Sequence, residues 1–587
     1  ENLFDDSASR LENAPQEVQR RVVYRHEAEI SGLTPGSERT YRIMSVDENG
    51  GVHYAGPFTL EPAPRAGEPI EILLTSDMQE RYNVLPNYEK VAELFPDLEA
   101  IFFAGDIVNV PYRAASWFDA NRDQWADNIA SGNFNAVNNV PFFPSMQGRF
   151  DELQPTSPSA GGELLQHVPL YPSIGNHEVN GRFRPNQEIV VNGAARTVDL
   201  NYMDNDPQPR WYAAWRYEQN KNSINPSGDA SVRERWIAEN SNDFASYRDL
   251  WTLPDENNES YYVKIIGDVA LISMNASRIW RTWNVNANDR GKFTETAADA
   301  NNPGEWGFGD HIFEPFHRGS EQYDWLAEVL QRADVQAAKY RVVMAHQTMF
   351  GVGDNAVPVQ TNPQMEIVYR DQNGIEQFKA VPMPDSDEGQ AETFASEVQP
   401  LIDANAIISV RYEYPLTEDY WLTDIEPLLE ANNVDLVHTG HSHVWNRAKS
   451  ASGKLDYIET SNVGNCFGAF WTNDAGQSVS SNNGGRVSWA SSFWNAIDDP
   501  NDNRWDGENY ARFGDPHGRE IIFPNISNAQ ADYVGGEAVP YLCSNAEVSV
   551  FTILDTGMGA VRSFAFDPRP AAGEPSPVVE FDRLMLD

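Results

Sequence analysis

Short apolar runs recur along the chain beyond residue 70, and a polar residue follows each run directly. The runs EILLTS, AIFFAG, VPLYPSIG, YRVVMA and VDLVHTG end just before Asp77, Asp106, Asn176, His346 and His441. Segments with helical spacing, such as NYEKVAELFPDLEA and SEQYDWLAEVLQRA, separate some of these runs. Buried strands that alternate with helices are typical of a layered α/β domain. We therefore predict one large α/β domain over residues 71–587.

Residues 1–70 follow a different pattern. Residues 1–20 are polar and charged, which predicts a poorly ordered arm. Residues 21–62 alternate in strand fashion around the turn signals SGLTPGSER and DENGG, which predicts a small all-β module. A full seven-stranded sandwich needs about 100 residues, so we expect only part of one. The proline-rich residues 63–70 are interpreted as a linker to the α/β domain.

The polar residues at the strand ends predict a shared site. Ligands of open α/β sheets bind beyond the carboxyl ends of the strands, so the runs bring carboxylate, amide and imidazole groups to one edge. A single Asp or His after a strand is often only a cap, whereas five such positions in order favour a common function. These groups suit divalent first-row metal ions. His438 lies inside an apolar run and is predicted to be a packed histidine.

The charge of the chain excludes some partners. The sequence has 43 Lys and Arg against 87 Asp and Glu, a net charge of −44. This balance argues against a nucleic-acid duplex or an anionic membrane surface, because both attract basic patches. No apolar run approaches the roughly 18 residues of a membrane span. A strongly acidic surface suits a saline medium, where repulsion is screened, although it also serves simple solubility.

Two further features bear on the compartment. The chain starts at Glu1 rather than Met, as it would after removal of a leader, and we expect a secreted or periplasmic protein. The sequence has 2 cysteines, Cys466 and Cys543. They form one disulfide or remain two buried thiols, and both alternatives stay open at this point.

The strand-end motifs also carry a family resemblance. The series SDMQ (76–79), GDIVN (105–109), GNHE (175–178), MAHQ (344–347) and GHSH (440–443) resembles the calcineurin-like metallophosphoesterase superfamily. The segments SGLTPGSERTYR, YYVKIIGDVALISMN, SEQYDWLAEVL and GHSHVWNR are similar to its purple acid phosphatase branch. The resemblance implies a four-layer α/β/β/α sandwich of two mixed sheets, preceded by a fibronectin type III-like module. It also implies phosphate-ester hydrolysis by a metal-bound hydroxide at two divalent metals.

The resemblance assigns a role to each motif residue. Asp106 is expected to bridge both metals. The expected ligands are Asp77 and His443 for the first metal, and Asn176, His346 and His441 for the second. His177 is expected over the phosphate, where it stabilises charge or protonates the leaving oxygen, with Glu178 orienting its imidazole. Asn176, His177 and Arg447 are expected to contact the substrate, although Arg447 is equally well explained as a structural residue; Arg113 is a poorer candidate.

The chain departs from the family pattern at the first metal. The superfamily motif D-x-H is replaced by Asp77-Met78-Gln79, and Asn109 stands where purple acid phosphatases have a tyrosine. Gln79 or Asn109 could bind metal through its amide oxygen. Without a phenolate ligand we expect a colourless enzyme. The lower negative charge favours manganese, zinc or ferrous iron over a ferric ion, with calcium as an alternative.

These expectations define the functional hypotheses. The first is a phosphatase acting on small phosphomonoesters. The alternatives are a phosphodiesterase or nucleotidase with the same centre, and a non-catalytic binding protein with a relic metal site. Long segments without an obvious core, at about residues 140–165, 181–240, 281–318 and 349–425, are expected to wall the metal cleft and set substrate choice. Surface decoration is the other explanation of these segments, and the oligomeric state is not predicted.

Overall fold

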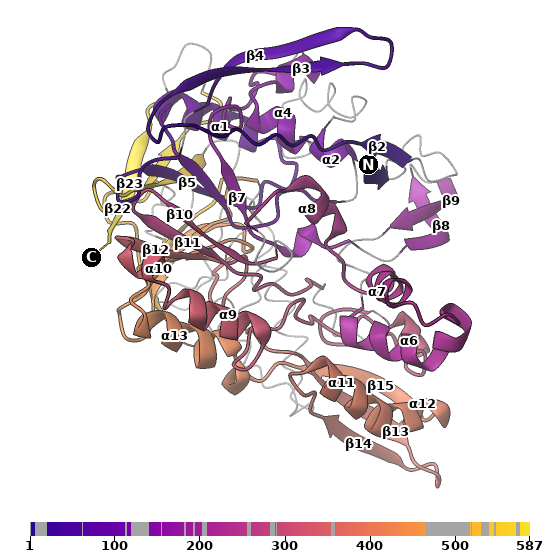
Figure 1. Ribbon diagram of the computed structural model, residues 1–587. Coiled ribbons are helices and arrows are strands. Elements are labelled where there is room, and N and C mark those ends of the chain that lie inside the picture. Colours follow the sequence, from indigo (N-terminus) through magenta and orange to yellow (C-terminus); the bar gives the residue numbers. More distant parts are fainter. Residues whose placement is uncertain are drawn as a thin grey trace.

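The structure is a computed structural model of the 587-residue chain (Figure 1). It describes residues 2–5, 20–60, 63–111, 114–118, 140–153, 155, 157–180, 183–191, 194–201, 208–254, 260–281, 288, 290–353, 359–464, 466, 469, 517, 519–529, 539–544, 548–570 and 576–586. The statements below concern these residues. Among the described helices, none combines the length and the apolar character that a bilayer crossing requires.

A mixed six-stranded sheet contains the first strands of the predicted α/β domain. Its order is β23-β22-β21-β5-β6-β7. The strands are β5 (Glu71–Thr75), β6 (Ala100–Phe103), β7 (Leu170–Pro172), β21 (Ser549–Asp555), β22 (Ala560–Phe566) and β23 (Val579–Met585). Strands β5, β6 and β7 are parallel, whereas β21 pairs antiparallel with β5. The carboxyl ends of β5, β6 and β7 therefore lie at one edge.

A second, eight-stranded sheet is also mixed. Its order is β10-β11-β12-β16-β18-β17-β19, and β20 pairs with β17. The strands are β10 (Tyr262–Ile266), β11 (Val269–Ser273), β12 (Tyr340–Met344), β16 (Leu436–Thr439), β17 (Trp445–Lys449), β18 (Asp456–Thr460), β19 (Glu520–Ile521) and β20 (Tyr541–Leu542). Strands β11, β12, β16 and β18 run parallel to one another. The predicted α/β fold with several sheets is confirmed.

Alternate side chains of each strand explain how these elements pack. Ile72 and Leu74 of β5 share one buried cluster with Leu271 and Met344 of the second sheet, so the two sheets have a common core. Leu73 points to the opposite face, where helices α1 (Val84–Leu94) and α4 (Phe142–Met146) pack. The outer face of the eight-stranded sheet packs against α9 (Glu321–Val329), α10 (Ala333–Ala337) and α13 (Glu426–Ala431). Period-2 alternation thus gives the central strands, such as β5 and β11, two buried faces.

Three of the long segments share a buried core. Strands β13 (Gln364–Arg370), β14 (Glu376–Val381) and β15 (Ile407–Glu413) form an antiparallel sheet in the order β14-β13-β15. Trp211, Phe308, Phe394 and Ile367 belong to a buried cluster that joins this sheet to α6 (Arg210–Ile224). The expectation of segments without an obvious core is wrong here, because aromatic side chains from three separate segments complete one another's burial.

The structure describes further helices and short helical turns. They are α2 (Ala114–Trp117), α5 (Phe150–Leu153), α7 (Ala230–Glu239), α8 (Ala245–Leu250), α11 (Asp387–Thr393) and α12 (Gln399–Asp403). Short 3-10 turns are η3 (Asn176–Glu178), η4 (Ala297–Asp299), η5 (Pro303–Glu305) and η7 (Leu416–Glu418), and π-helical turns are η6 (Phe394–Val398) and η8 (Trp421–Ile425). Strands β8 (Phe183–Val191) and β9 (Ala194–Asn201) form a hairpin.

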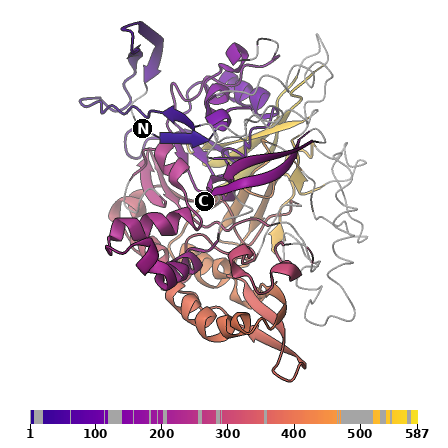
Figure 2. The same cartoon turned by 90° about the vertical axis from the view of Figure 1, so that its right-hand side faces the viewer.

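The amino-terminal residues form two separate pairs of strands. Strand β1 (Asn2–Asp5), within the predicted polar arm, pairs with β2 (Arg20–Val23). Strands β3 (Arg39–Val46) and β4 (Val52–Leu60) form an antiparallel hairpin, which Figure 2 shows projecting from the other described elements. The all-β character of this region is therefore present, and the fibronectin type III-like assignment stays a prediction.

Candidate metal centre

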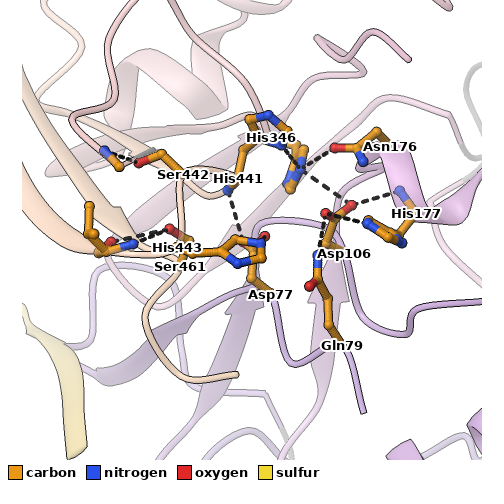
Figure 3. Close-up of polar contacts among 12 residues, drawn as sticks. Asp77, Gln79, Asp106, Asn176, His177, His346, His441, Ser442, His443 and Ser461 are labelled. Carbon is orange, nitrogen blue, oxygen red and sulfur yellow. Dashed lines mark hydrogen bonds and ion pairs between the residues drawn. The ribbon is translucent and has the colours of Figure 1, made fainter. Parts of the chain in front are cut away.

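The strand ends of both sheets bring their polar residues to one place (Figure 3). Asp77, Asp106 and Asn176 follow β5, β6 and β7 of the six-stranded sheet. His346 follows β12, and His441 follows β16, of the eight-stranded sheet. Because the two sheets share a core, the carboxyl edges of their parallel strands face a common space. The site is thus built from two sheets rather than from the single edge that the strand pattern suggested.

One group of buried potential ligands contains Asp106, His346 and His441. One ligand atom from each of these residues lies within 4.8 Å of the others. His346 Nε2 lies 3.3 Å from Asp106 Oδ1 and 3.2 Å from His441 Nδ1. Asn176 adds its amide oxygen, 3.1 Å from His346 Nε2. The four side chains therefore converge on one point with two imidazoles, a carboxylate and an amide.

A second group contains Asp77, Asp106 and His443, with the same mutual limit of 4.8 Å. His443 Nε2 lies 3.4 Å from Asp77 Oδ1. That oxygen is buried and has no hydrogen-bond donor among the described residues. Asp106 belongs to both groups, so its carboxylate lies between two sets of ligand atoms.

The two groups fit divalent cations. Imidazole nitrogens, carboxylates and an amide oxygen are the ligands that such ions prefer, and each group offers at least three. Buried oxygens without donors are costly, and the uncompensated Oδ1 of Asp77 faces the imidazole of His443. A cation between these atoms would remove that cost.

The backbone at the site is held in an unusual conformation. Left-handed φ angles occur at Asp77 (51°), Asp106 (55°), His441 (83°) and His443 (64°). Such angles cost non-glycine residues about 1–3 kcal/mol each and persist only where surrounding contacts fix them. One contact is the close approach of Gly440, where a Cβ would lie 2.6 Å from Asp77 Oδ2. The strain is therefore concentrated at the metal-ligand candidates.

Burial and mutual charge set the protonation of the site. Burial alone would raise the pKa of Asp106, but His346 and His177 lower it below its usual range. Burial disfavours the charged form of His346, yet the carboxylates of Asp106 and Asp77 outweigh this and raise its pKa to about 10. In the metal-free protein a proton on His346 therefore compensates the carboxylates, and a metal ion would displace it.

His177 lies beside both groups but in neither. Its side chain is 17 % exposed, whereas that of Asp106 is fully buried, and its Nε2 lies 3.9 Å from Asp106 Oδ2. Its Nδ1 lies 2.9 Å from the backbone oxygen of Asn109. The expectation that Glu178 orients this imidazole is wrong. Glu178 instead accepts hydrogen bonds from the backbone N–H groups of Gly175, Asp106 and Ile107, at 2.7–2.8 Å.

The two amides at the departures from the family pattern differ in position. Gln79 Nε2 donates to Asp106 Oδ2 at 2.9 Å, so this amide lies against the carboxylate that both groups share. Asn109 Nδ2 donates to the backbone oxygen of Gln79 at 2.7 Å. Gln79 thus contacts the site directly, and Asn109 supports Gln79.

The remaining predicted residues lie elsewhere. Arg447 forms an ion pair with Asp582, with Nε and Oδ2 2.9 Å apart, and is 6 % exposed. This pair joins β17 of one sheet to β23 of the other, which favours the structural alternative over substrate contact. His438 is fully buried and its Nε2 lies 2.8 Å from Thr460 Oγ1, as expected for a packed histidine. Arg113 lies outside the described residues.

Sequence reasoning missed several neighbours of the site. Gln347 Nε2 lies 3.3 Å from both Asn176 Oδ1 and His441 Nδ1. Its Oε1 accepts from the backbone N–H of Arg278 at 2.9 Å. Arg278 follows β11, which runs parallel to β12, so the strand-end argument could have found it. Glu459 of β18 accepts from the backbone N–H of Ser442, between His441 and His443, at 2.7 Å, and was missed because a Glu within a strand is usually an exposed alternate residue.

Two buried cations lie near these neighbours. Arg278 and Lys292 are each 3 % exposed, and Lys292 Nζ lies 3.1 Å from Asp310 Oδ2. Burial lowers the pKa of Lys292 to about 7 against the opposing effect of Asp310. Burial also lowers the pKa of His441, and the charges of His346, His443 and Lys292 lower it further. Lys292 is the last of the charges that lower this pKa, and the carboxylate of Asp106 opposes them.

The two cysteines form a disulfide. Cys466 and Cys543 are bonded, with Cα atoms 5.4 Å apart and a sequence separation of 77. The alternative of two unpaired thiols is thereby excluded. Both residues belong to the cluster under the outer helices of the eight-stranded sheet.

Comparison with known proteins gives only distant similarity. No protein-family model matches the sequence, and no curated protein matches it. Among solved structures, the purple acid phosphatase PPD1 from yellow lupin (Lupinus luteus) seeds has a TM-score of 0.39 at 12% identity, over 94% of this chain and 61% of that chain. PhoD has a TM-score of 0.37 at 11% identity, over 94% of this chain and 75% of its own. GAP50, the anchor in the inner membrane complex of Plasmodium, has a TM-score of 0.30 at 10% identity, over 88% of this chain and 89% of its own.

These comparisons do not assign the chain to a family. The chain spans 61% of the length of the lupin phosphatase chain. What defines the site is its geometry: two groups of metal-ligand candidates that share Asp106, with His177 beside them.

Proposed function

We propose that this protein is a metal-dependent phosphoesterase that acts on small phosphomonoesters. The observation that carries the proposal is the sharing of Asp106 by two groups of buried ligands. Asp77, Asp106 and His443 would hold one divalent cation, and Asp106, Asn176, His346 and His441 the other. Two such ions would polarise the phosphate oxygens and lower the pKa of an attacking water. Manganese, zinc and ferrous iron suit the donors, and calcium is the alternative.

The residues of the chain then have separate tasks. Asp106, which belongs to both groups, would supply its carboxylate to both ions. His177, the more exposed group, faces the phosphate and donates a proton from Nε2 to the leaving oxygen. The backbone oxygen of Asn109 accepts from Nδ1–H and orients the ring, so the proton that Nε2 donates is the second proton of the imidazolium form, beside the Asp106 carboxylate. Glu178 supports the reaction indirectly, by holding the backbone that carries Asp106.

The positive surroundings support an anionic substrate. Two divalent ions carry more charge than the carboxylates of Asp77 and Asp106 offset. Lys292 adds positive charge that acts on His441, although the chain as a whole carries a net charge of −44. A phosphomonoester dianion gains more from such charge than a diester monoanion does. This difference favours monoesterase activity over the phosphodiesterase alternative.

We also propose the finer architecture that the resemblance implies. The clusters between the sheets and under the helices on both outer faces support a four-layer α/β/β/α sandwich. The hairpin of β3 and β4 supports a partial fibronectin type III-like module at residues 21–62, linked by residues 63–70 to the domain at 71–587. The disulfide supports export to an oxidising compartment, secreted or periplasmic.

A paired assay tests the proposed function. Metal content is measured by elemental analysis, beside hydrolysis of p-nitrophenyl phosphate and bis(p-nitrophenyl) phosphate with manganese, zinc or ferrous iron. We expect two metals per chain and faster turnover of the monoester, and loss of both metal and activity in Asp106→Asn. A faster diester reaction would support the diesterase alternative. Absence of both bound metal and turnover would support the alternative of a non-catalytic binding protein with a relic metal site.

A further inference from the structure

A buried carboxylate lies directly behind the loop that contains His441 and His443. Glu459 of β18 is 2 % exposed. Its Oε1 accepts from the Ser442 backbone N–H at 2.7 Å and from Ser461 Oγ at 2.6 Å. Its Oε2 accepts from Ser442 Oγ at 2.7 Å. These contacts link a strand of the eight-stranded sheet to the residue between the two histidines.

One further donor completes this set. Asn446 Nδ2 of β17 donates to Glu459 Oε2 at 2.6 Å. Each carboxylate oxygen thus accepts two hydrogen bonds, which fills the acceptor capacity of an ionised carboxylate. Hydrogen bonds to charged groups are the strong class, and a buried carboxylate requires such partners. Burial nevertheless raises the pKa of Glu459 to about 7, so the chain retains this group at a cost.

The loop that Glu459 contacts has a strained backbone, which contacts from outside the loop have to maintain. Residues 441 and 443 have φ angles of 83° and 64°, and Ser442 lies between them. Asp77 fixes the loop on one side by accepting the His441 N–H at 2.9 Å. Glu459 fixes it on the other side through both polar groups of Ser442. The strained conformation is therefore held from two directions.

The hydrogen bonds between Glu459 and Ser442 bear on both groups of metal-ligand candidates. His441 belongs to the group with His346, and His443 belongs to the group with Asp77. Rotation of the loop at Ser442 would move both imidazoles at once. A residue that contacts neither imidazole can thus control one ligand of each proposed metal.

We infer that Glu459 is a positioning residue for metal binding, which acts through Ser442 to direct His441 and His443 toward the two ions. The inference rests on the proposed metal centre. Groups behind metal ligands typically contribute roughly 10- to 100-fold to metal affinity. Glu459 contributes to metal affinity at both proposed sites, because its carboxylate holds the loop that supplies one ligand to each site.

The test uses Glu459→Gln, which keeps the size of the side chain but replaces one acceptor oxygen with a donor. Binding of Mn²⁺ to the metal-stripped full chain is measured by competition with a chelator. We expect both dissociation constants to rise by roughly 10- to 100-fold. Glu295→Gln is the matched control. Glu295 is also 2 % exposed and accepts from Gly307 N, Phe308 N and Tyr412 Oη, away from the ligand loop.

The outcomes separate this inference from the proposed function. Unchanged Mn²⁺ affinity in Glu459→Gln, or equal losses in Glu459→Gln and Glu295→Gln, would overturn the positioning role. Absence of Mn²⁺ binding to the wild-type chain would overturn the proposed centre instead. If Glu459→Gln does not fold, Ser442→Ala removes one of the bonds to the loop and should still weaken Mn²⁺ binding severalfold. Unchanged binding in that variant would also reject the inference.

Discussion

The backbone N–H of His441 donates a 2.9 Å hydrogen bond to Oδ2 of Asp77, across a sequence separation of 364. Asp77 follows β5 of one sheet and His441 follows β16 of the other. A side chain that is proposed to bind one ion therefore also positions the backbone of a ligand for the second ion. We therefore expect the two proposed metal sites to be coupled through this bond.

Substitutions of Asp77 separate its two roles. Asp77→Asn keeps an oxygen that accepts the His441 N–H but loses the ligand charge, so we expect weaker binding at the first metal only. Asp77→Ala loses both the ligand charge and the acceptor for the His441 N–H. Metal binding at the second site should therefore weaken as well, by roughly 10- to 100-fold. Stepwise metal titration measures both constants. Equal effects of the two variants on the second site would argue against coupling through the hydrogen bond.

His177→Ala should leave both metals bound. The imidazole lies 3.9 Å from Asp106 and belongs to neither ligand group, whereas it is placed to donate a proton. Turnover of the monoester should fall by roughly 10²- to 10⁴-fold, the usual contribution of a general acid. Elemental analysis and kcat are measured on the same sample. Release of a metal from this variant would mean that His177 is a ligand.

Gln79→His should strengthen the first metal site. The Gln79 amide contacts Asp106 Oδ2, so an imidazole at this position is within reach of the same ion. We expect the first-site dissociation constant to fall by roughly tenfold or more, the order of magnitude of changes next to a metal. Chelator competition with Zn²⁺ checks this. Asn109→His is the control. Asn109 donates to the Gln79 backbone rather than to Asp106, so the affinity of this variant for Zn²⁺ should not rise.

Lys292 makes monoester binding depend on pH. Its pKa of about 7, lowered by burial, means that the ammonium loses its charge as pH rises through 7. The KM for the monoester dianion should therefore rise between about pH 6 and 8 in the wild type, and much less in Lys292→Gln. A diester substrate should show a smaller dependence in both. The same KM profile in wild type and variant would exclude Lys292 from substrate attraction.

Removal of the disulfide should destabilise the chain. The bond between Cys466 and Cys543 closes a separation of 77 residues and restricts the unfolded chain. The double variant Cys466→Ser and Cys543→Ser should lose about 2–5 kcal/mol of unfolding free energy. Denaturant unfolding of wild type, reduced wild type and variant measures this. Reduced wild type and variant should coincide, and no difference from the oxidised protein would refute a structural role.

Much of the site follows from strand patterns in the sequence. A short apolar run limits where a strand ends, so Asp106 and His346 could be placed at strand ends without a structure. Parallel strands then bring such residues to a common edge. The sharing of that edge by two sheets depends on tertiary packing, which no local pattern encodes. The strand pattern alone therefore predicted the candidates but not their division into two groups.

Other features depended on contacts between distant segments. The partner of the His177 imidazole is a backbone oxygen at Asn109, and backbone acceptors leave no sequence signal. Glu178 therefore took the wrong role in the prediction. The core around Phe308 and Phe394 was missed because separate segments supply its aromatic residues, and none is amphipathic enough by itself. Arg447 remained ambiguous until its partner Asp582 was located.

The pairing of β5 with β21 has a consequence for biosynthesis. Strand β5, which precedes Asp77, is covered on one edge by β6 and on the other by β21 at residues 549–555. During synthesis, every proposed metal ligand leaves the ribosome before β21 does. The nascent chain therefore carries a complete set of ligands beside an open strand edge, the kind of surface that promotes aggregation. This edge of β5 is therefore covered only after residues 549–555, well beyond the last proposed ligand, have been made.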